Sequence, residues 1–483
     1  MSSFARSLSS LLIITGTLAV GAAAAGASPS GFSAPALLSA CAASASAQVI
    51  FPSETPTRAS GPGAIVWRSS KACPGGAGAR LTPLGAGDAP GETSTPRTAS
   101  GRPIAPRGLW LAAPAPHGQI LIATTAAGSS SRLSLIQGVA GGPFTALALP
   151  SPSMALARPS PSPAGGRPGL STAGVLPSAS VALALSNAYR GDLGLLSYTR
   201  TGARKGQLRV QVERHFAHAF TRAWPVGGSA RVPQSATIAL DFRTDALAVW
   251  ARGGSIYARD LPVSGAPHPV QRLAATTSAL HITALLSDDN RAIVAWAQTR
   301  ASLTSVYIDR SAAGVRFGAP ALIERFRDPD GLASPAASPR LIRLSSESVM
   351  IAWAGSAAGH WVVRTAAIGE ALGPPNTIAA PGADAMLADL VPGPDADALV
   401  LWTEPRGLQA QPREPAAQAI FAARGFDAFL ERTIFSAPEQ VAPLGPVRDP
   451  TVALNPASDG AVVVWGAEGG RLQYALRAGG GAS

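Results

Sequence analysis

Charged side chains concentrate in two segments of a chain in which only 14% of the residues are charged. Glu324–Pro339 reads ERFRDPDGLASPAASP, and Thr403–Ala417 reads TEPRGLQAQPREPAA. Segments longer than about 12 residues without a strand pattern are usually functional or disordered in a compact protein. Guanidinium groups interspersed with carboxylates can hold a polar ligand by ion pairs and hydrogen bonds. We therefore expect a recognition patch here, with a solvated loop held by local ion pairs as the alternative.

The side chains assigned to this patch are Glu324, Arg325, Arg327, Asp328, Asp330, Glu404, Arg406, Arg413 and Glu414. His360 and Trp361 join them because they stand at the start of a predicted strand, where an indole ring could stack on a sugar. The alternative for Trp361 is packing at the edge of a sheet.

Metal and catalytic motifs are weak in this sequence. His215 and His218 are the only close histidine pair, and on a strand an i, i+3 pair points to opposite faces of the sheet. Asp328-Pro-Asp330-Gly331 begins like a calcium loop but lacks the later bidentate acid, so we interpret it as a turn. A phosphate-binding loop, a nucleophile elbow and a His-Glu-x-x-His motif are all missing from the sequence. We expect no metal and no cofactor, and we assign no catalytic residue.

A repeated β-strand unit must position the charged segments. Its clearest copy is Asp459–Trp465 (DGAVVVW), a turn followed by an apolar run that ends in tryptophan. Recurrence of one strand along a chain is typical of repeat architectures. Eight copies favour eight repeats, or seven if Gly118–Thr124 is not a true copy. The other copies are Gly63–Trp67, Gly118–Thr124, Asp192–Tyr198, Asp245–Trp250, Asn290–Trp296, Glu347–Trp353 and Asp397–Trp402.

Each repeat is predicted to contain four strands. A short apolar strand such as Thr451–Leu454 precedes a turn rich in Asp, Asn and Gly, residues that tolerate positive φ. The tryptophan strand follows, and then a strand that alternates apolar with polar residues, such as Ser255–Arg259. The fourth strand begins with Phe-x-Ala-Pro, at Phe317 and again at Phe435. Because proline cannot donate to a central ladder, this strand is expected at the outer edge of the sheet.

The two ends of the chain complement each other. The last repeat ends after its third strand, Leu472–Leu476, and therefore lacks a fourth. The missing motif stands near the amino end, where Phe32–Leu38 reads FSAPALL. We expect residues 31–38 to complete the last sheet, which closes a ring and leaves no open sheet edge.

Small four-stranded sheets arranged radially, with a Trp or Tyr between neighbours, make a β-propeller. In family terms the mature chain resembles bacterial secreted propellers of the broad sialidase-like, Asp-box-adjacent kind, and the resemblance is architectural. The expected fold is all-β: a single β-propeller of eight blades, with seven as the alternative. Each blade has four antiparallel strands, and the N-terminal strand completes the last blade.

The resemblance does not extend to the catalytic residues of sialidases. Those enzymes need an arginine triad, a Tyr–Glu nucleophile pair and an acidic Asp, whereas this chain has five tyrosines, none beside a convincing Glu. The closest approach to an Asp-box is Ser458-Asp459-Gly460 with Trp465, and its spacing is wrong.

Three long insertions are expected on one face of the ring. In a propeller, the connections between strands two and three emerge on the same face as those between strand four and the next strand one. The segments 150–176, 324–339 and 403–417 fall at such connections, and the first is Pro- and Ser-rich like a disordered segment. The predicted recognition patch belongs to the other two.

The amino end has the layout of an export signal. Arg6 precedes the apolar run Leu11–Val20 and a small-residue tract, which predicts a secretory signal peptide over residues 1–27. A retained anchor is the alternative, although this run is shorter than the ~20 residues that a membrane span needs. The propeller is then expected over residues 28–478, followed by a flexible tail at 479–483, with no transmembrane span in the mature chain.

The two cysteines, Cys41 and Cys73, predict one disulfide, because an exported protein meets an oxidising compartment. Lipoprotein anchoring at Cys41 is the less favoured alternative, since residues 28–37 separate its processing box from the apolar run. The net charge is +11, and 37 of the 39 basic residues are arginine. This excess could attract acidic glycans or could reflect codon bias. Basic runs interleaved with aromatics are missing, so we expect no nucleic-acid partner.

The expected protein is an exported, disulfide-linked monomer that binds an extracellular or cell-envelope ligand, either a polysaccharide or a protein. The first alternative is a glycan-active hydrolase or lyase with its site at the mouth of the channel. The second is a purely structural surface protein.

Overall fold

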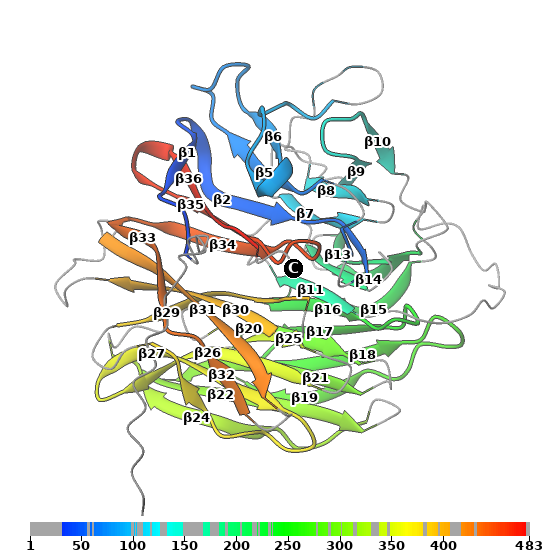
Figure 1. The fold of residues 1–483 in the computed structure, drawn as a ribbon. Coiled ribbons are helices and arrows are strands. Elements are labelled where there is room, and N and C mark those ends of the chain that lie inside the picture. Colours follow the sequence, from blue (N-terminus) through cyan, green and yellow to red (C-terminus); the bar gives the residue numbers. More distant parts are fainter. Residues whose placement is uncertain are drawn as a thin grey trace, which may run out of the picture.

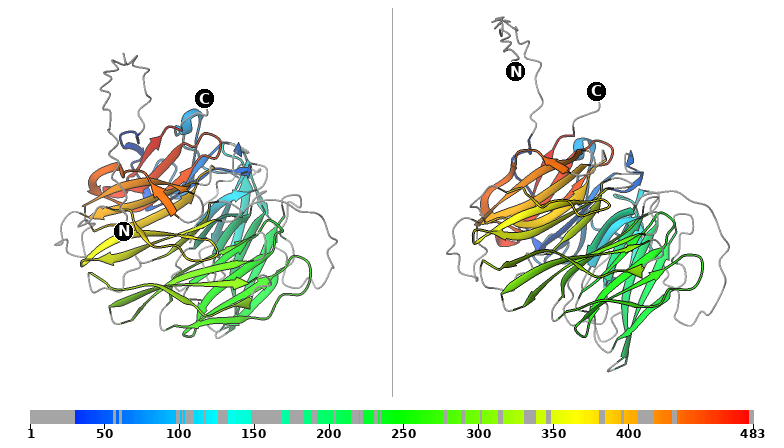
Figure 2. Two further views of the ribbon diagram at one scale, coloured as in Figure 1. Left: turned by 60° about the horizontal axis from the view of Figure 1, so that its bottom comes forward. Right: turned by 90° about the horizontal axis from the view of Figure 1, so that it is seen from below.

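The computed structural model contains eight small antiparallel sheets arranged as the blades of a β-propeller (Figures 1 and 2). The residues it describes are 31–55, 58–59, 62–97, 101, 103, 110–115, 118–125, 133–147, 168–173, 183–188, 192–202, 205–214, 220, 223–229, 233, 235–276, 279–287, 291–300, 302–312, 316–329, 338–344, 348–379, 384–394, 397–405, 417–428 and 432–479. Each blade is numbered here in chain order and its strands are given from the axis outward.

Blades 1 to 4 occupy the first half of the ring. Blade 1 has β2 (Ala42–Ile50), β5 (Ala64–Ser69) and β6 (Gly78–Pro83), and blade 2 has β7 (Trp110–Ala115), β8 (Gln119–Thr125), β9 (Leu133–Gly138) and β10 (Phe144–Leu147). Blade 3 has β11 (Pro168–Ala173), β12 (Leu183–Ala188), β13 (Leu193–Gly202), β14 (Lys205–Glu213) and β15 (Trp224–Ser229). Blade 4 has β16 (Ser235–Leu240), β17 (Ala246–Arg252), β18 (Ser255–Leu261) and β19 (Gln271–Ala275). A small ribbon, β3 (Ser53–Thr55) with β4 (Arg58–Ala59), follows β2.

Blades 5 to 8 complete the ring. Blade 5 has β20 (Ala279–Leu286), β21 (Ala292–Arg300), β22 (Leu303–Ala312), β23 (Arg316–Phe317) and β24 (Ala321–Arg327). Blade 6 has β25 (Arg340–Arg343), β26 (Val349–Ala357), β27 (His360–Ile368) and β28 (Asn376–Thr377), and blade 7 has β29 (Met386–Pro392), β30 (Asp397–Pro405), β31 (Ala417–Ala428), β32 (Arg432–Phe435) and β33 (Glu439–Pro446). Blade 8 has β34 (Arg448–Leu454), β35 (Ala461–Gly466), β36 (Leu472–Arg477) and β1 (Ala36–Ser39).

The innermost strands show that the ring is closed. In order, β2, β7, β12, β16, β20, β25, β29 and β34 each contact the next, and β34 contacts β2 again; in blade 3 this strand is β12, and the additional strand β11 lies on its inner side. The prediction of eight blades is therefore confirmed, and Gly118–Thr124 marks a true repeat because β8 is the second strand of blade 2.

A buried tryptophan lies at most of the interfaces between blades. The described residues form eight apolar clusters, one for each pair of neighbouring blades. Trp296, Trp353, Trp402 and Trp465 each belong to the cluster that their blade shares with the preceding one. Trp67 does the same between blades 8 and 1. These rings are at most 3% exposed, so the predicted wedge between sheets is confirmed.

The strand with the Ala-Pro sequence lies at the outer edge of its sheet, as predicted, and it is divided into two segments at the proline. In blade 5 the two segments β23 and β24 flank Pro320 and both pair with β22. Blade 7 repeats this arrangement around Pro438, where β32 and β33 both pair with β31. The missing proline N–H lies at the break between the two segments, where no ladder bond is needed.

The closing strand comes from the amino end, as predicted. Phe32 forms a bridge with Arg477, and β1 pairs antiparallel with β36, where Ala36 faces Tyr474. In Figure 1 the blue β1 accordingly lies beside the red β36. The disulfide Cys41–Cys73 then joins the segment that follows β1 to the β5–β6 connection of blade 1. The predicted bond is confirmed, and it lies where the ring closes.

Several details differ from the sequence-based expectations. Blade 1 has three strands plus a single bridge from Leu81 to Ser94, and blade 3 has five strands. The extra strand β11 falls inside the segment 150–176 expected to be a loop, where it pairs with β12 and lies against β16 and β20 of the next blades. The ends of the other two predicted loops are also strand, because β24 extends to Arg327 and β30 to Pro405. No helix in the described ranges is long and apolar enough to cross a membrane.

The disulfide yields a stability prediction. It closes a loop across 32 residues, and in the chain-entropy account such a bond stabilises a fold by about 3–4 kcal/mol. We expect the Cys41→Ser/Cys73→Ser variant to lose about this much unfolding free energy, measured by urea unfolding of the isolated protein. A reducing agent should weaken the wild type and leave the variant unchanged. Equal sensitivity of both proteins to the reducing agent would contradict the prediction.

Candidate ligand-binding site

The connections between strands divide the molecule into two faces. Face A carries the connections between strands two and three and from each blade to the next, and face B carries the connections between strands one and two and between strands three and four. The predicted loops 324–339 and 403–417 fall at connections of face A, whereas the segment 150–176 contains the strand β11. The residues predicted to bind a ligand therefore have to be located relative to this face.

Arg325 and Arg327 lie on β24 near face A, and both side chains are exposed. Asp328 follows directly but is only 2% exposed. Its Oδ1 accepts a hydrogen bond from Thr304 Oγ1 at 2.7 Å, and its backbone N–H donates to Ser302 O at 2.9 Å. Asp328 therefore anchors the end of β24 to the β21–β22 connection.

His360 and Trp361 begin β27, also near face A. The backbone N–H of Trp361 donates to Asp384 Oδ1 at 2.9 Å, and His360 Nδ1 lies 3.5 Å from the same oxygen. The Trp361 ring is 1% exposed and meets Phe326 edge to face, with ring centres 5.7 Å apart. In this structure the ring packs at the interface of blades 5 and 6 and does not face solvent.

Glu404, at the end of β30, is half-buried and accepts a hydrogen bond from Trp402 Nε1 at 2.9 Å. Asp330, Arg406, Arg413 and Glu414 lie outside the described residues, as do His215 and His218. The predicted residues that are described thus share face A but are spread over blades 5, 6 and 7.

Sequence reasoning missed a polar group on the innermost strands. We call His281, Arg340, Asp389 and Thr451 the inner cluster; they lie on β20, β25, β29 and β34, the first strands of blades 5 to 8. All four are half-buried. Three of these strands have irregular pairing there, between Leu280 and Thr283, between Leu387 and Asp389, and between Arg448 and Thr451. An irregularity of this kind re-aims a side chain relative to a regular strand.

Asp389 is held by donors from its own strand and the next blade. Thr451 Oγ1 donates to Asp389 Oδ2 at 3.2 Å, and the backbone N–H of Val452 donates to the same oxygen at 3.3 Å. The N–H of Leu390 donates to Oδ1 at 3.0 Å. Burial raises the pKa of Asp389, while the Arg340 charge and these hydrogen bonds oppose the rise.

His281 lies on the other side of Arg340. Burial and the nearby Arg340 charge both lower the pKa of His281, so its imidazole is neutral near pH 7. The inner cluster thus combines a cation, a carboxylate, a hydroxyl group and a neutral imidazole on four neighbouring blades. One sequence signal could have indicated them: each is a polar residue in a short segment that reads as an apolar first strand.

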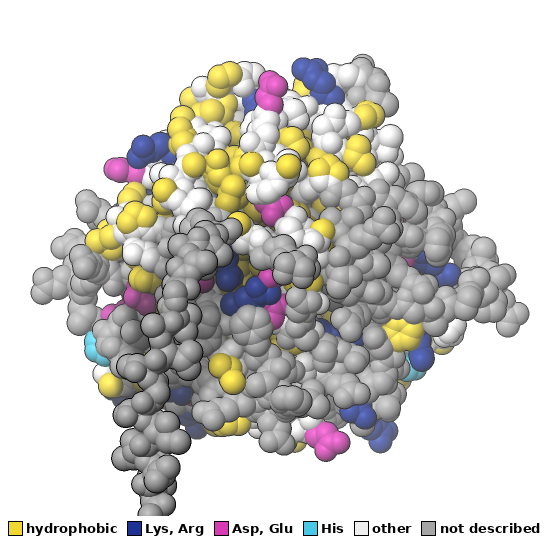
Figure 3. Space-filling model, in the orientation of Figure 1, with side chains coloured by type: hydrophobic (Ala, Val, Ile, Leu, Met, Phe, Trp, Pro, Cys, Tyr) yellow, Lys and Arg dark blue, Asp and Glu magenta, His cyan; other side chains and the backbone are white. Residues whose placement is uncertain are grey.

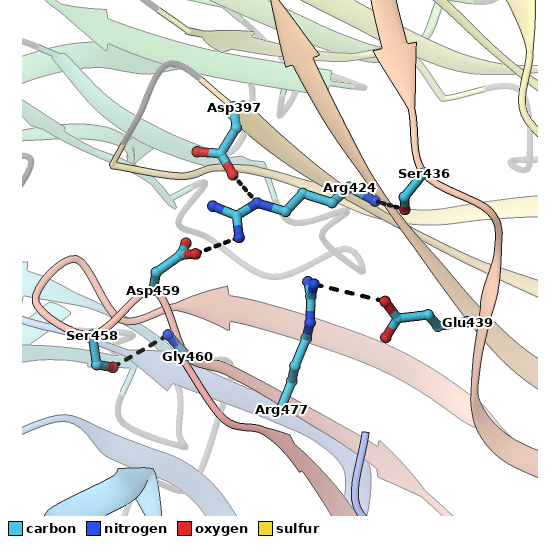
Figure 4. A network of polar contacts seen from close by, with 8 residues as sticks. All are labelled: Asp397, Arg424, Ser436, Glu439, Ser458, Asp459, Gly460 and Arg477. Carbon is cyan, nitrogen blue, oxygen red and sulfur yellow. Dashed lines mark hydrogen bonds and ion pairs between the residues drawn. The ribbon is translucent and has the colours of Figure 1, made fainter. Parts of the chain in front are cut away.

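Face B carries a different polar network, which joins blades 7 and 8 (Figure 4). Arg424 on β31 forms ion pairs with Asp397 of its own blade and with Asp459 on the β34–β35 hairpin. Arg477 of blade 8 lies 3.6 Å from Glu439 of blade 7. Figure 3 shows basic side chains gathered near the centre of the face drawn, with acidic side chains close by.

The same hairpin is held from its other side by Asp88 of blade 1. Asp88 accepts hydrogen bonds from Asn455 Nδ2 at 2.7 Å and from Ser458 Oγ at 3.3 Å. Each charged group of this network has partners within the ring, so its contacts serve closure of the propeller. We therefore place the candidate ligand site on face A.

Face B also carries a buried acid whose negative charge is not balanced by a nearby cation or hydrogen bond among the described residues. Glu213 on β14 is 0% exposed, and neither carboxylate oxygen has a hydrogen-bond partner in the described structure. Burial, followed by the charge of Asp192, raises the pKa of Glu213 to about 7. Thr244 of blade 4 donates to Asp192 at 2.5 Å, so this acidic pair lies between blades 3 and 4.

Comparisons with known proteins identify no family for the chain. No protein-family model matches the chain, and no curated protein matches its sequence. Among solved structures, the polysaccharide lyase Uly1 is 9% identical over 93% of this chain and 99% of its own, with a TM-score of 0.43. The NanB sialidase of Streptococcus pneumoniae is 10% identical over 77% and 68%, with a TM-score of 0.33. The α-L-arabinofuranosidase Arb93A of Fusarium graminearum is 8% identical over 49% and 90%, with a TM-score of 0.27. Values this low carry no argument about function.

The raised pKa of Glu213 predicts a pH dependence of stability. The folded state keeps the proton up to about pH 7, whereas the unfolded chain releases it near its ordinary pKa of 4.5. Stability from this group is therefore complete at low pH and is lost as the pH rises through about 7. We expect Glu213→Gln to stabilise the protein at about pH 8 by on the order of 1–3 kcal/mol, and to have little effect near pH 4.

The measurement is the difference in thermal midpoint between Glu213→Gln and wild type across this pH range. The exposed Glu370→Gln serves as the matched control and should show no such trend. A difference in midpoint that does not change with pH would refute the assignment.

Proposed function

We propose that the chain is an exported binding protein that holds part of an extracellular glycan at the inner cluster on face A. The observation that carries the proposal is the placement of four polar side chains on the first strands of four neighbouring blades, three of them at irregularities in the strand pairing. Polar groups in a largely apolar core cost stability unless they are paired, so their presence favours a functional role.

The chemistry of the inner cluster suits sugar hydroxyl groups. Arg340 can donate, Asp389 can accept, and Thr451 and the neutral His281 can do either. A sugar ring presents donors and acceptors on several sides at once, which a group spread over four blades can match. A protein ligand would engage the cluster only through an inserted side chain or chain end, so we favour a glycan.

The predicted recognition patch supplies the outer part of the proposed surface. Arg325 and Arg327 are exposed near face A, and Glu404 is half-buried there. Asp330, Arg406, Arg413 and Glu414 belong to the same two connections, and we keep them as part of the proposed patch. His360 contributes a half-buried imidazole beside Asp384.

Export is part of the proposal and rests on the signal-like residues 1–27 and on the disulfide Cys41–Cys73. Fractionation of cells that express the full chain tests it. Protein recovered outside the cytoplasm, shortened at its amino end and oxidised at both cysteines, is the expected result. Full-length, reduced protein in the cytoplasm would refute export.

A lyase acting on uronic-acid polymers is the second candidate, and a specific arrangement favours it. A neutral His281 could take a proton from carbon, while the adjacent Arg340 neutralises the neighbouring carboxylate of the sugar. Elimination then breaks the bond from the sugar carbon to the glycosidic oxygen, which departs as the hydroxyl group of the other fragment after taking up a proton from water, and an unsaturated sugar remains. Ultraviolet absorbance by the unsaturated product, followed during incubation with polyuronates, tests this candidate. Binding without any rise in absorbance leaves the binding protein.

The central prediction concerns Arg340. We expect Arg340→Gln to weaken binding of a glycan selected by array screening by at least about tenfold, because one charge-assisted hydrogen bond contributes roughly 1.5–3 kcal/mol. Thr451→Val should weaken it less, because a neutral hydrogen bond is lost. Titration calorimetry measures both effects.

Arg243→Gln is the matched control, since this exposed arginine lies on the β16–β17 hairpin of face B. It should bind like wild type. Thermal midpoints within a few degrees of wild type show that the variants are folded. Unchanged affinity in folded Arg340→Gln would remove the inner cluster from the binding site.

A further inference from the structure

Blade 4 has a layered aromatic and basic group on its outer strands near face A. Tyr257 on β18 stacks on Trp250 of β17, with ring centres 5.7 Å apart. Arg272 on β19 lies opposite Tyr257 in the pairing register. The Nε–H of Arg272 donates to Ser255 Oγ at 3.0 Å, and this serine is only 5% exposed. The guanidinium group is thus oriented by a buried hydroxyl while its side chain remains exposed.

Blade 5 repeats this group with the same residue types. Tyr307 on β22 stacks on Trp296 of β21, with ring centres 5.6 Å apart. Arg325 on β24 donates from Nε to Ser305 Oγ at 3.2 Å, and Ser305 is 6% exposed. Burial raises the pKa of Tyr307, but hydrogen bonds led by that from Arg325 outweigh this effect and leave the pKa lowered. The arginine is therefore fixed against the phenol as well as the serine.

The two groups lie on adjoining edges. Gln271, next to Arg272 on β19, accepts a hydrogen bond at Oε1 from the backbone N–H of Phe317 on β23, at 3.2 Å. Tyr307 and Phe317 also pack against the apolar cluster that blades 4 and 5 share. The outer strands of the two blades are therefore in contact. The two arginines reach corresponding serines from different positions, because Arg272 faces Tyr257 whereas Arg325 faces Ser305 in the pairing register.

This part of face A is basic. Three more exposed arginines stand at the same ends of the strands: Arg252, Arg300 and Arg327. The described acids of these two blades either lie on face B or already form hydrogen bonds or ion pairs with other residues of the protein. Glu324 accepts from Trp353 Nε1 at 2.5 Å and lies 3.1 Å from Arg364 Nε, and Asp328 is buried. Neither Arg272 nor Arg325 has a carboxylate partner in the described part of the chain.

We propose that the outer rim of blades 4 and 5 on face A binds a linear anionic polysaccharide, with Arg272 and Arg325 taking successive charged units. The inference deepens the proposed function, since it names the charge and polymeric nature of the glycan. Two guanidinium groups on adjoining blades, each oriented by a buried serine, match a ligand that repeats its own carboxylate or sulfate group. A single small anion would need only one of them.

The test compares two double variants with the same change of charge on the same blades. Arg272→Gln/Arg325→Gln removes the two rim arginines of face A. Arg243→Gln/Arg291→Gln removes two exposed arginines from the hairpins of face B. The probes are polygalacturonate, dextran sulfate and uncharged dextran, immobilised for surface binding measurements at several salt concentrations.

We expect wild type and the face B variant to bind at least one anionic polymer and to ignore dextran. The rim variant should lose at least about tenfold in affinity, and its dependence on salt should fall, because fewer condensed counterions are released on binding. Equal losses in both double variants would show that net charge alone matters and would overturn the inference. So would an unchanged affinity in the rim variant, or no binding of either polymer by wild type.

Two further measurements separate this inference from the proposed function and from a different partner. Arg340→Gln tests the inner cluster. In this background the substitutions Arg272→Gln/Arg325→Gln should still lower the affinity for the polymer, so a failure of one proposed site can be told apart from a failure of the other. Single-stranded DNA of matched charge is the competitor. If DNA binds as tightly as the polysaccharide and depends equally on Arg272 and Arg325, the assignment to a polysaccharide is wrong.

Discussion

Burial of one large aromatic ring between each sheet and its neighbour is the interaction on which most of this ring depends. A four-stranded sheet cannot cover both of its faces alone, and Trp296, Trp353, Trp402 and Trp465 each fill the gap to the preceding blade. Truncation of such a ring to alanine typically costs about 3–5 kcal/mol. Because the chain forms a circle, every interface must be filled at once. The pairing of β1 with β36 completes the sheet of blade 8, which couples the amino end of the chain to the last blade.

Arginine provides a second layer of contacts between blades. Arg259 donates to the carbonyl of Pro225 in blade 3 at 2.7 Å, Arg310 to that of Glu370 in blade 6 at 2.9 Å, and Arg343 to that of Leu286 in blade 5 at 3.1 Å. A planar group with five donors can satisfy several backbone carbonyls from one position, which an ammonium group does less well. Part of the arginine excess therefore has a structural role. The basic character of the chain is not by itself a sign of a ligand, and only the arginines that lack such partners can argue for one.

Much of the architecture was predictable because the sequence repeats the features that pack. The tryptophan strand and the Phe-x-Ala-Pro edge each recur, so the blade count, the strand order and the closing strand at Phe32–Leu38 followed from matching segments. The candidate site was harder to predict from the sequence. His281 and Asp389 occupy irregular positions where the pairing register shifts, and regular alternation cannot place such a side chain. Trp361 shows another limit of sequence-based prediction. Its position at the start of a strand is compatible with an exposed ring or with a ring buried against Phe326, and the sequence alone does not decide between them.

The distribution of acids separates the two faces by role. On face B, Asp397, Asp459 and Asp88 are used to join blades 7, 8 and 1, and the buried Glu213 and Asp192 lie between blades 3 and 4. The carboxylates of Asp397, Asp459 and Asp88 are paired in contacts that hold the ring, so a ligand would have to break these contacts to reach them. On face A of blades 4 and 5 the acids are engaged while Arg272 and Arg325 keep exposed guanidinium groups on buried serines. A ligand can therefore bind on face A without disturbing closure, and this asymmetry is the physical reason to look for the partner of the protein there.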